Sequence, residues 1–518
     1  MRRRALLRAG SLSAAALAAP GIAAGRARVA PMQDGDAYEP LARLPIDNAA
    51  EVVVGDGGET AYVAATTGFV TVDVSDPGEP EILAEERRLS FDDASANELL
   101  DLEVDGDRMV VAGPANPSAD TFFHGFAVYD VSDPSEPELL DTYETGAHIH
   151  NCYLEGDYCY IVGNGQEANP LVIYDVADGI EEVGRWSLLE REPDWGDVYW
   201  LARYLHDVYV QEGIAYLSHW DAGTYLVDVS DPAEPEFISR VQQESLEEQL
   251  DREAESGNNG QVGLPGNDHY AAVDETGDLL AVGREAWATG SGEPDRPGGI
   301  DLYDVSDPAE PTHRATIDAP RAVNEQYRGG LWTTAHNFEL RNGRLYSAWY
   351  QGGVKIHDVS DPAAPEEIAS WRDPAEAGFW TARVLEPEDE DAETFVATST
   401  PLIPNSPTTG ALYTFPIEAG EQADPPSLTD PEDLEFDVQT PTEDNETNES
   451  TTGGPSGPSA DGTGNGTSTD GTNSSNATDD TADESDDSIP GFTAGLGLAG
   501  GAGAVALEWL RRRDDDRD

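Results

Sequence analysis

Basic residues are scarce in this sequence. Its 518 residues include 29 Lys and Arg against 102 Asp and Glu, for a formal net charge of −73, and Lys355 is its single lysine. Because binding to nucleic acid or to an anionic membrane surface needs a cationic face, this composition excludes both as partners. Acidic residues spread over a whole chain are typical of adaptation to high salt, where screening weakens the repulsion between like charges.

Cysteine is also rare. The two cysteines, Cys152 and Cys159, flank an expected tight turn with the sequence YLEGDY. A disulfide between the neighbouring strands makes strict demands on geometry, and the register does not obviously place the two residues opposite each other. Two free buried thiols are the alternative, and the sequence leaves both open.

The first 30 residues have the order of an export signal, with an arginine cluster, a short apolar stretch and then small residues. Arg3 and Arg4, followed by Ala-Leu-Leu, resemble a twin-arginine signal. That resemblance implies export of the folded protein by the twin-arginine translocase. We therefore expect residues 1–30 to be a signal peptide and not part of the fold.

Residues 490–518 are similar to a C-terminal sorting signal. The stretch from Phe492 to Leu510 is apolar except for one glutamate and precedes three arginines, so it is long enough to be a transmembrane segment. Together with Pro490 and Gly491, it resembles the PGF-type signal of archaeal surface proteins. This resemblance implies processing by an archaeosortase and a membrane anchor on the outer face of the cell.

Residues 421–489 are rich in Thr, Ser, Gly, Asn and acidic residues and contain almost no aromatics. Such a segment cannot bury a core and is expected to be disordered. Its Asn-x-Ser/Thr sequons predict a glycosylated stalk that holds the globular part away from the membrane. The sequons begin at Asn445, Asn448, Asn465, Asn473 and Asn476.

A motif of the form YDVSDPSEPELL recurs within residues 31–420. The first aspartate of each copy is Asp73, Asp130, Asp175, Asp228, Asp304 or Asp358, and a weaker copy lies near Phe415. Each unit contains two short strands around a Gly/Asp turn, an aliphatic strand that enters the motif, a Ser-Asp-Pro turn and a fourth strand. Four antiparallel strands at this period predict a blade of a β-propeller.

The number of blades follows from the two ends of the repeat array. The last copy lacks its fourth strand, whereas residues 39–46 resemble a fourth strand without the other three. Pairing these two segments would close the ring and cover an open sheet edge. The sequence therefore predicts an all-β fold, a seven-bladed β-propeller of four-stranded blades closed by an N-terminal strand.

The aliphatic strand of the repeat carries a resemblance to a known family. LVIYDV, from Leu171 to Val176, and its relatives YLVDVS and LYDVS resemble the LVIVD-repeat family over about residues 39–417. The resemblance implies a propeller-like and often surface-exposed protein. It implies little about activity.

Four of the nine histidines occupy one position of the repeat. Each lies four residues before the aliphatic residue that precedes the first turn of its unit, and Ala50, Leu100 and Trp380 take that place in the other blades. The first strand of a blade is innermost, so these side chains should converge at the mouth of the central channel, where they could hold Zn, Cu or Fe. The four candidate ligands are His150, His206, His269 and His336.

Two other interpretations of this pattern stay open. Duplication would also repeat a histidine that only forms hydrogen bonds between blades, and a polar channel could bind a ligand without a metal. Further candidates are His148 and His219 as extra ligands or rim residues, Asp207 as the group that orients a ring, and Glu285 as a group that acts on a substrate.

Long loops at 191–207, 242–269 and 283–299 lie in the blades that carry the histidines and should open on the same face. The second of them is expected to form a short amphipathic helix over the channel. Tryptophans in and near these loops favour a pocket there. Two functions follow: a surface propeller that binds a protein, glycan or small molecule, with or without a metal, or a metal-dependent oxidoreductase or hydrolase.

Overall fold

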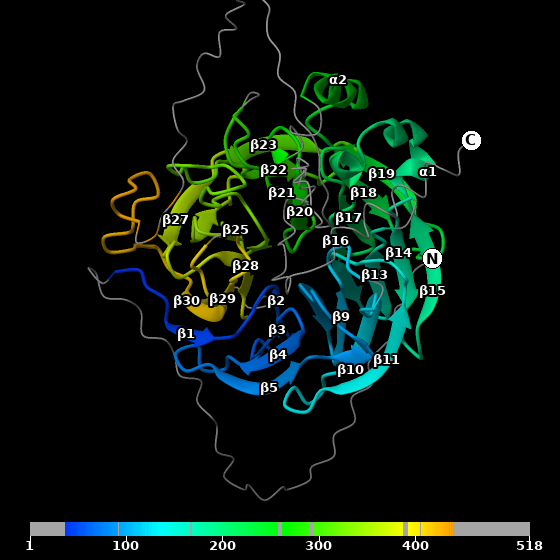
Figure 1. The fold of residues 1–518 in the computed structure, drawn as a ribbon, viewed down its shortest axis with the longest axis horizontal. Helices are drawn as coiled ribbons and strands as arrows, with labels where there is room; N and C mark the ends of the chain where they lie inside the picture. Colours follow the sequence, from blue (N-terminus) through cyan, green and yellow to red (C-terminus); the bar gives the residue numbers. More distant parts are fainter. Residues whose placement is uncertain are drawn as a thin grey trace, which may run out of the picture.

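The computed structural model describes residues 37–438 except 92, 120, 166–167, 257–261, 291–293, 387–391, 405, 435 and 437. These residues form seven antiparallel sheets arranged as the blades of a ring (Figure 1). The predicted signal peptide with Arg3 and Arg4, the sequons and the Pro490-Gly491-Phe492 sorting signal lie outside the described residues. Among the helices that the structure describes, none is both long and apolar enough to cross a membrane.

The first three blades use consecutive strands. Blade 1 consists of β2 (Val52–Val54), β3 (Thr60–Ala64), β4 (Gly68–Asp73) and β5 (Glu81–Arg87). Blade 2 consists of β8 (Asp101–Asp105), β9 (Arg108–Gly113), β10 (Gly125–Asp130) and β11 (Glu138–Glu144), after a small hairpin of β6 (Ser90–Phe91) and β7 (Ala94–Ser95). Blade 3 consists of β12 (Cys152–Glu155), β13 (Tyr158–Val162), β14 (Leu171–Asp175) and β15 (Glu181–Trp186).

The next three blades follow the same plan. Blade 4 consists of β16 (Asp207–Gln211), β17 (Ile214–Ser218), β18 (Thr224–Asp228) and β19 (Glu236–Val241). Blade 5 consists of β20 (Asp268–Val273), β21 (Leu279–Arg284), β22 (Ile300–Asp304) and β23 (Thr312–Ile317). Blade 6 consists of β24 (Phe338–Arg341), β25 (Arg344–Ala348), β26 (Val354–Asp358) and β27 (Glu366–Trp371), with β31 (Gly420–Glu421) added in parallel at its edge.

Blade 7 joins the two ends of the propeller. It consists of β28 (Phe379–Val384), β29 (Thr394–Ser399), β30 (Ala411–Pro416) and the N-terminal β1 (Ala42–Pro45). β1 pairs antiparallel with β30, from Ala42 opposite Thr414 to Pro45 opposite Ala411. The predicted closure of seven blades by an N-terminal strand is confirmed.

The recurring aspartates form the turn that links the third and fourth strands of a blade. In blade 4, Asp228 Oδ1 accepts hydrogen bonds from the backbone N of Ser230 at 2.9 Å and from its hydroxyl at 2.6 Å. These two bonds lower the pKa of Asp228, because they stabilise the carboxylate. The motif therefore recurs because one turn geometry is repeated around the ring.

The long loops of blades 3 to 5 carry the helical segments α1 (Leu188–Arg191), η1 (Pro193–Asp197), η2 (Trp200–Arg203) and α2 (Leu246–Ser256). The predicted amphipathic helix is confirmed as α2, but its predicted place over the channel is wrong. Arg252 pairs with Asp221 at 3.0 Å, and Glu253 accepts a hydrogen bond from the backbone N of Tyr199. These contacts hold α2 at the outer side of the ring (Figure 1).

The cysteines are two free buried thiols. Cys159 lies opposite Leu154 and Cys152 opposite Ile161, so the two cysteines are not directly paired across β12 and β13. Burial raises the pKa of both thiols well above the usual value, and the nearby Asp101 carboxyl adds to the rise.

These thiols give a prediction about chemical reactivity. We expect the native protein not to react with an aromatic disulfide reagent, because the thiolates are rare and shielded. The same protein, denatured without reductant, should release two equivalents of reporter. Release of none after denaturation would instead indicate a disulfide.

Candidate metal centre

The four aligned histidines lie in a row around the centre of the ring. Their ring centroids are separated by 4.2 Å from His150 to His206, 4.0 Å from His206 to His269 and 4.4 Å from His269 to His336. Each residue is buried, with at most 6% of its surface exposed. Trp380 of blade 7 continues the row at 4.3 Å from His336. The structure thus places the four aligned residues in one row. Among the described residues, however, only His206 and His269 of the four belong to a group whose ligand atoms are close enough to hold one ion.

Backbone carbonyls of neighbouring blades orient three of these rings. His150 Nδ1 lies 3.2 Å from Ala115 O, His206 Nδ1 lies 3.2 Å from His269 O, and His336 Nδ1 lies 2.6 Å from Trp380 O. Because a carbonyl oxygen only accepts, Nδ1 carries the hydrogen in each ring and Nε2 carries the lone pair. Asp207, the predicted orienting group, instead accepts a hydrogen bond from Asn151 at 2.9 Å. The orienting role of Asp207 stays a prediction.

Glu285 stands next to His269, the third ring of the row. Its Oε2 lies 3.5 Å from His269 Nε2, and its Oε1 accepts a hydrogen bond from the Tyr350 hydroxyl. Within the part of the chain that the structure describes, Glu285 Oε2 and both ring nitrogens of His269 have no hydrogen-bond partner. His206, His269 and Glu285 each offer one ligand atom, and these atoms all lie within 4.8 Å of one another.

The environment keeps the imidazoles neutral. Burial lowers the pKa of His150 to about 4 and that of His336 to about 3, and it lowers those of His206 and His269 well below the usual value. Repulsion between neighbouring imidazolium charges adds to the effect for the last three rings. Neutral imidazole is the form that binds a metal, so at pH 7 these rings need no deprotonation to act as ligands.

A small cavity lies beside the histidines. Polar side chains that directly follow the histidine position of the repeat form part of its lining. The cavity measures about 10 Å³, which is room for about one water molecule or ion. It is lined by Glu51, Leu100, Asp101, His150, Asn151, His206, Asp207, His269, His336, Asn337 and Trp380. Asn151 and Asn337 directly follow His150 and His336 in the sequence, and Glu51 and Asp101 follow the residues that take the histidine position in blades 1 and 2. Aligning the repeats therefore identifies all four.

The other candidates lie apart from this row. His148 Nε2 contacts the Tyr204 hydroxyl at 3.2 Å. His219 Nδ1 contacts Arg203 O at 3.2 Å, and its ring packs on Trp186 and Tyr225. Neither residue shares the arrangement of the four aligned rings.

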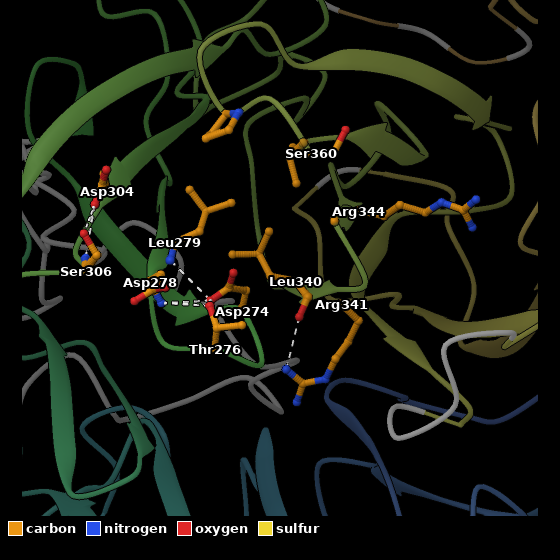
Figure 2. Close-up of a pocket in the computed structure, with 13 residues that line it drawn as sticks. Asp274, Thr276, Asp278, Leu279, Asp304, Ser306, Leu340, Arg341, Arg344 and Ser360 are labelled. Carbon is orange, nitrogen blue, oxygen red and sulfur yellow. Dashed lines mark hydrogen bonds between the residues drawn. The ribbon is translucent and has the colours of Figure 1, made fainter.

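A larger cavity, of about 460 Å³, lies between blades 5 and 6 (Figure 2). The turn from Asp274 to Asp278 and the turn from Arg341 to Arg344 contribute to its lining. These turns follow β20 and β24, whereas His269 and His336 lie at the start of those strands or just before it. The cavity is therefore at the opposite end of the blades from the histidines, and none of its lining residues comes from the three long loops.

Comparisons with known proteins agree with the repeat. The LVIVD repeat matches residues 49–85, 121–145 and 202–243, which fall on blades 1, 2 and 4. The comparison with curated proteins found no match. A solved structure, the Myceliophteria thermophila Cps50 (Swd1) β-propeller domain, is 10% identical with a TM-score of 0.49, over 73% of this chain and 99% of that one. This chain is a seven-bladed β-propeller that carries LVIVD repeats.

Proposed function

We propose that the propeller binds one transition metal ion, Zn, Cu or Fe, at the histidine row. The observation that carries this proposal is the cluster of His206, His269 and Glu285, whose ligand atoms lie within 4.8 Å of one another. Two neutral imidazoles and a carboxylate form a donor set suited to these metals. A cation would also stabilise the Glu285 carboxylate, whose pKa burial raises well above the usual range.

The metal has a structural role and not a catalytic one in this proposal. An enzyme needs a substrate beside its metal, and the cavity that the histidines line, about 10 Å³, is too small for an organic molecule. We therefore favour a metal that ties blades 4 and 5 together at the axis. The long loops of the histidine face would then bind a protein, glycan or small molecule. The oxidoreductase or hydrolase alternative has no specific support in this geometry.

We also propose that the protein acts at the outer face of the cell membrane. Its support is the twin-arginine-type signal at Arg3 and Arg4 and the PGF-type signal at residues 490–518. The twin-arginine translocase and an archaeosortase would be the processing partners. Export in the folded state would let the propeller take up its metal before it leaves the cytoplasm.

Elemental analysis of the purified full chain tests the metal. We expect about one transition metal ion per chain, and none when His206 and His269 are both replaced by Gln, because two of three ligands are lost. A metal present at 1,000 times its dissociation constant should stabilise the native state by about 4 kcal/mol, so chelation should lower the melting temperature.

The control for this experiment is His313→Gln. The His313 side chain is 48% exposed and lies on β23, so its replacement should leave the metal content unchanged. The proposal fails if the wild-type chain neither contains nor takes up Zn, Cu or Fe. It also fails if the double variant and the control hold equal amounts of metal.

A further inference from the structure

Independently of the transition-metal centre, we infer a second cation site on the propeller axis, built from oxygen ligands and suited to a hard divalent cation such as Ca²⁺ or Mg²⁺. The site is the cavity of about 10 Å³ beside the histidine row. Five oxygen-bearing side chains from five blades line it, namely Glu51, Asp101, Asn151, Asp207 and Asn337. All five are at least nine-tenths buried. Carboxylate and amide oxygens are the ligands that hard cations prefer.

The amide oxygens of Asn151 and Asn337 are available to bind a ligand. Asn151 Nδ2 donates to Asp207 Oδ2 at 2.9 Å, and Asn337 Nδ2 donates to Glu51 Oε2 at 2.7 Å. In both pairs the amide therefore points its NH₂ group toward the acid and its oxygen away. Among the described residues, neither amide oxygen has a hydrogen-bond donor. Two buried acceptors that line one small cavity indicate a ligand that is electron-poor.

The charge balance indicates that this ligand is a cation. Arg383 Nη2 pairs with Glu51 Oε1 at 2.9 Å, and this guanidinium faces the group of acids. Asp101 and Asp207 form no ion pair within the described part of the chain; Asp101 Oδ2 accepts a hydrogen bond from the backbone N of Cys152 at 2.7 Å. A single water molecule could donate to both amide oxygens, but unlike a cation it would not offset the negative charge of these carboxyl groups when they ionise.

The two sites differ in ligand chemistry and so in metal preference. The imidazole nitrogens of the first site suit Zn, Cu or Fe, whereas a set of carboxylate and amide oxygens selects Ca²⁺ or Mg²⁺. The inferred cation would join blades 1, 2, 3, 4 and 6 at the axis. Ring closure would then depend on the divalent cation concentration outside the cell.

Calorimetric titration of Ca²⁺ and of Mg²⁺ into the chelator-treated full chain tests the inference. The titration belongs in concentrated potassium chloride, which screens the acidic surface and suppresses non-specific binding. We expect one saturable site for at least one of the two ions. Asp101→Asn and Asp207→Asn preserve side-chain shape, and each should weaken binding by more than the roughly 10- to 100-fold that loss of an outer-sphere partner causes.

Two further variants separate this site from others. Asp274→Asn, in the larger cavity at the other end of the blades, should bind Ca²⁺ and Mg²⁺ like the wild type. His269→Gln should lose the transition metal of the proposed function but keep the hard cation. Loss of both ions from His269→Gln would indicate a single shared centre and overturn the inference of a second site.

The inference is also overturned if neither ion binds the wild-type chain, or if both Asp101→Asn and Asp207→Asn bind as tightly as Asp274→Asn. Cooperative thermal unfolding of each variant checks that it is folded. Failure of the transition-metal test would leave this titration unaffected, because the two experiments use different ions and different variants.

Discussion

Replacing Arg383 by Met is expected to lower the free energy of unfolding by about 3–5 kcal/mol, the usual cost of removing one partner of a buried ion pair. The guanidinium pairs with Glu51 at 2.9 Å, donates to Phe338 O at 2.6 Å and lies over the Tyr270 ring at 5.5 Å. It therefore joins blade 7 to blades 1, 5 and 6. Its loss leaves the buried carboxyls beside the axis without their cation, and denaturant unfolding of the metal-free chain measures the effect.

The loss of unfolding free energy caused by Arg383→Met should depend on pH. Burial raises the pKa of Asp101 to about 8, so its folded-state pKa lies above the unfolded value. The protonated Asp101 carboxyl therefore contributes to the free energy of unfolding at low pH. This contribution is lost as the pH rises through the folded-state pKa. Without Arg383 the pKa of these acids rises further, so the variant should be closer to the wild type at pH 5 than at pH 8.

Two variants serve as controls for this prediction. Arg185→Met removes an exposed pair with Glu182 and should cost at most about 1 kcal/mol. Adding Glu51→Gln to Arg383→Met removes the partner carboxylate as well and should recover part of the loss. Equal deficits for Arg383→Met and Arg185→Met would contradict the assignment of a buried charge network.

Deleting residues 1–45 is expected to abolish cooperative folding of the propeller or to cause aggregation. The deletion removes β1, exposes the edge of β30 and removes Tyr38, which is buried and donates to Pro416 O at 2.9 Å. An open strand edge is a template for pairing with another chain. Burial of one large aromatic side chain alone contributes roughly 1.5–3 kcal/mol.

The matched control deletes residues 1–36 and keeps β1. This variant should unfold at the wild-type temperature and keep the oligomeric state of the wild type in size-exclusion chromatography. A synthetic peptide of residues 37–47, added to the longer deletion, should restore part of the cooperative transition by pairing with β30. If both deletions unfold alike, closure by β1 does not stabilise the ring.

The fold was predictable because the repeat is a local signal. The strand-turn-strand pattern around Asp228 and its equivalents depends on residues close in sequence, and the incomplete first and last units supply the blade count. The place of α2 was not predictable in this way. Its amphipathic pattern predicts a helix, but only the tertiary contact of Arg252 with Asp221 decides where that helix packs.

The candidate site was also predictable from the sequence only in part. Equivalent residues of successive blades meet at the axis, so aligning the repeats was enough to select His150, His206, His269 and His336. The alignment carried no information on which side-chain atoms meet. Glu285 meets His269 within blade 5, where β20 pairs with β21, and the asparagine–carboxylate pairs join equivalent positions of different blades. The sequence by itself thus determined the ring and its row of histidines. Only the tertiary structure decided which side-chain atoms meet beside them, because those distances depend on strand pairing within a blade and on packing between blades.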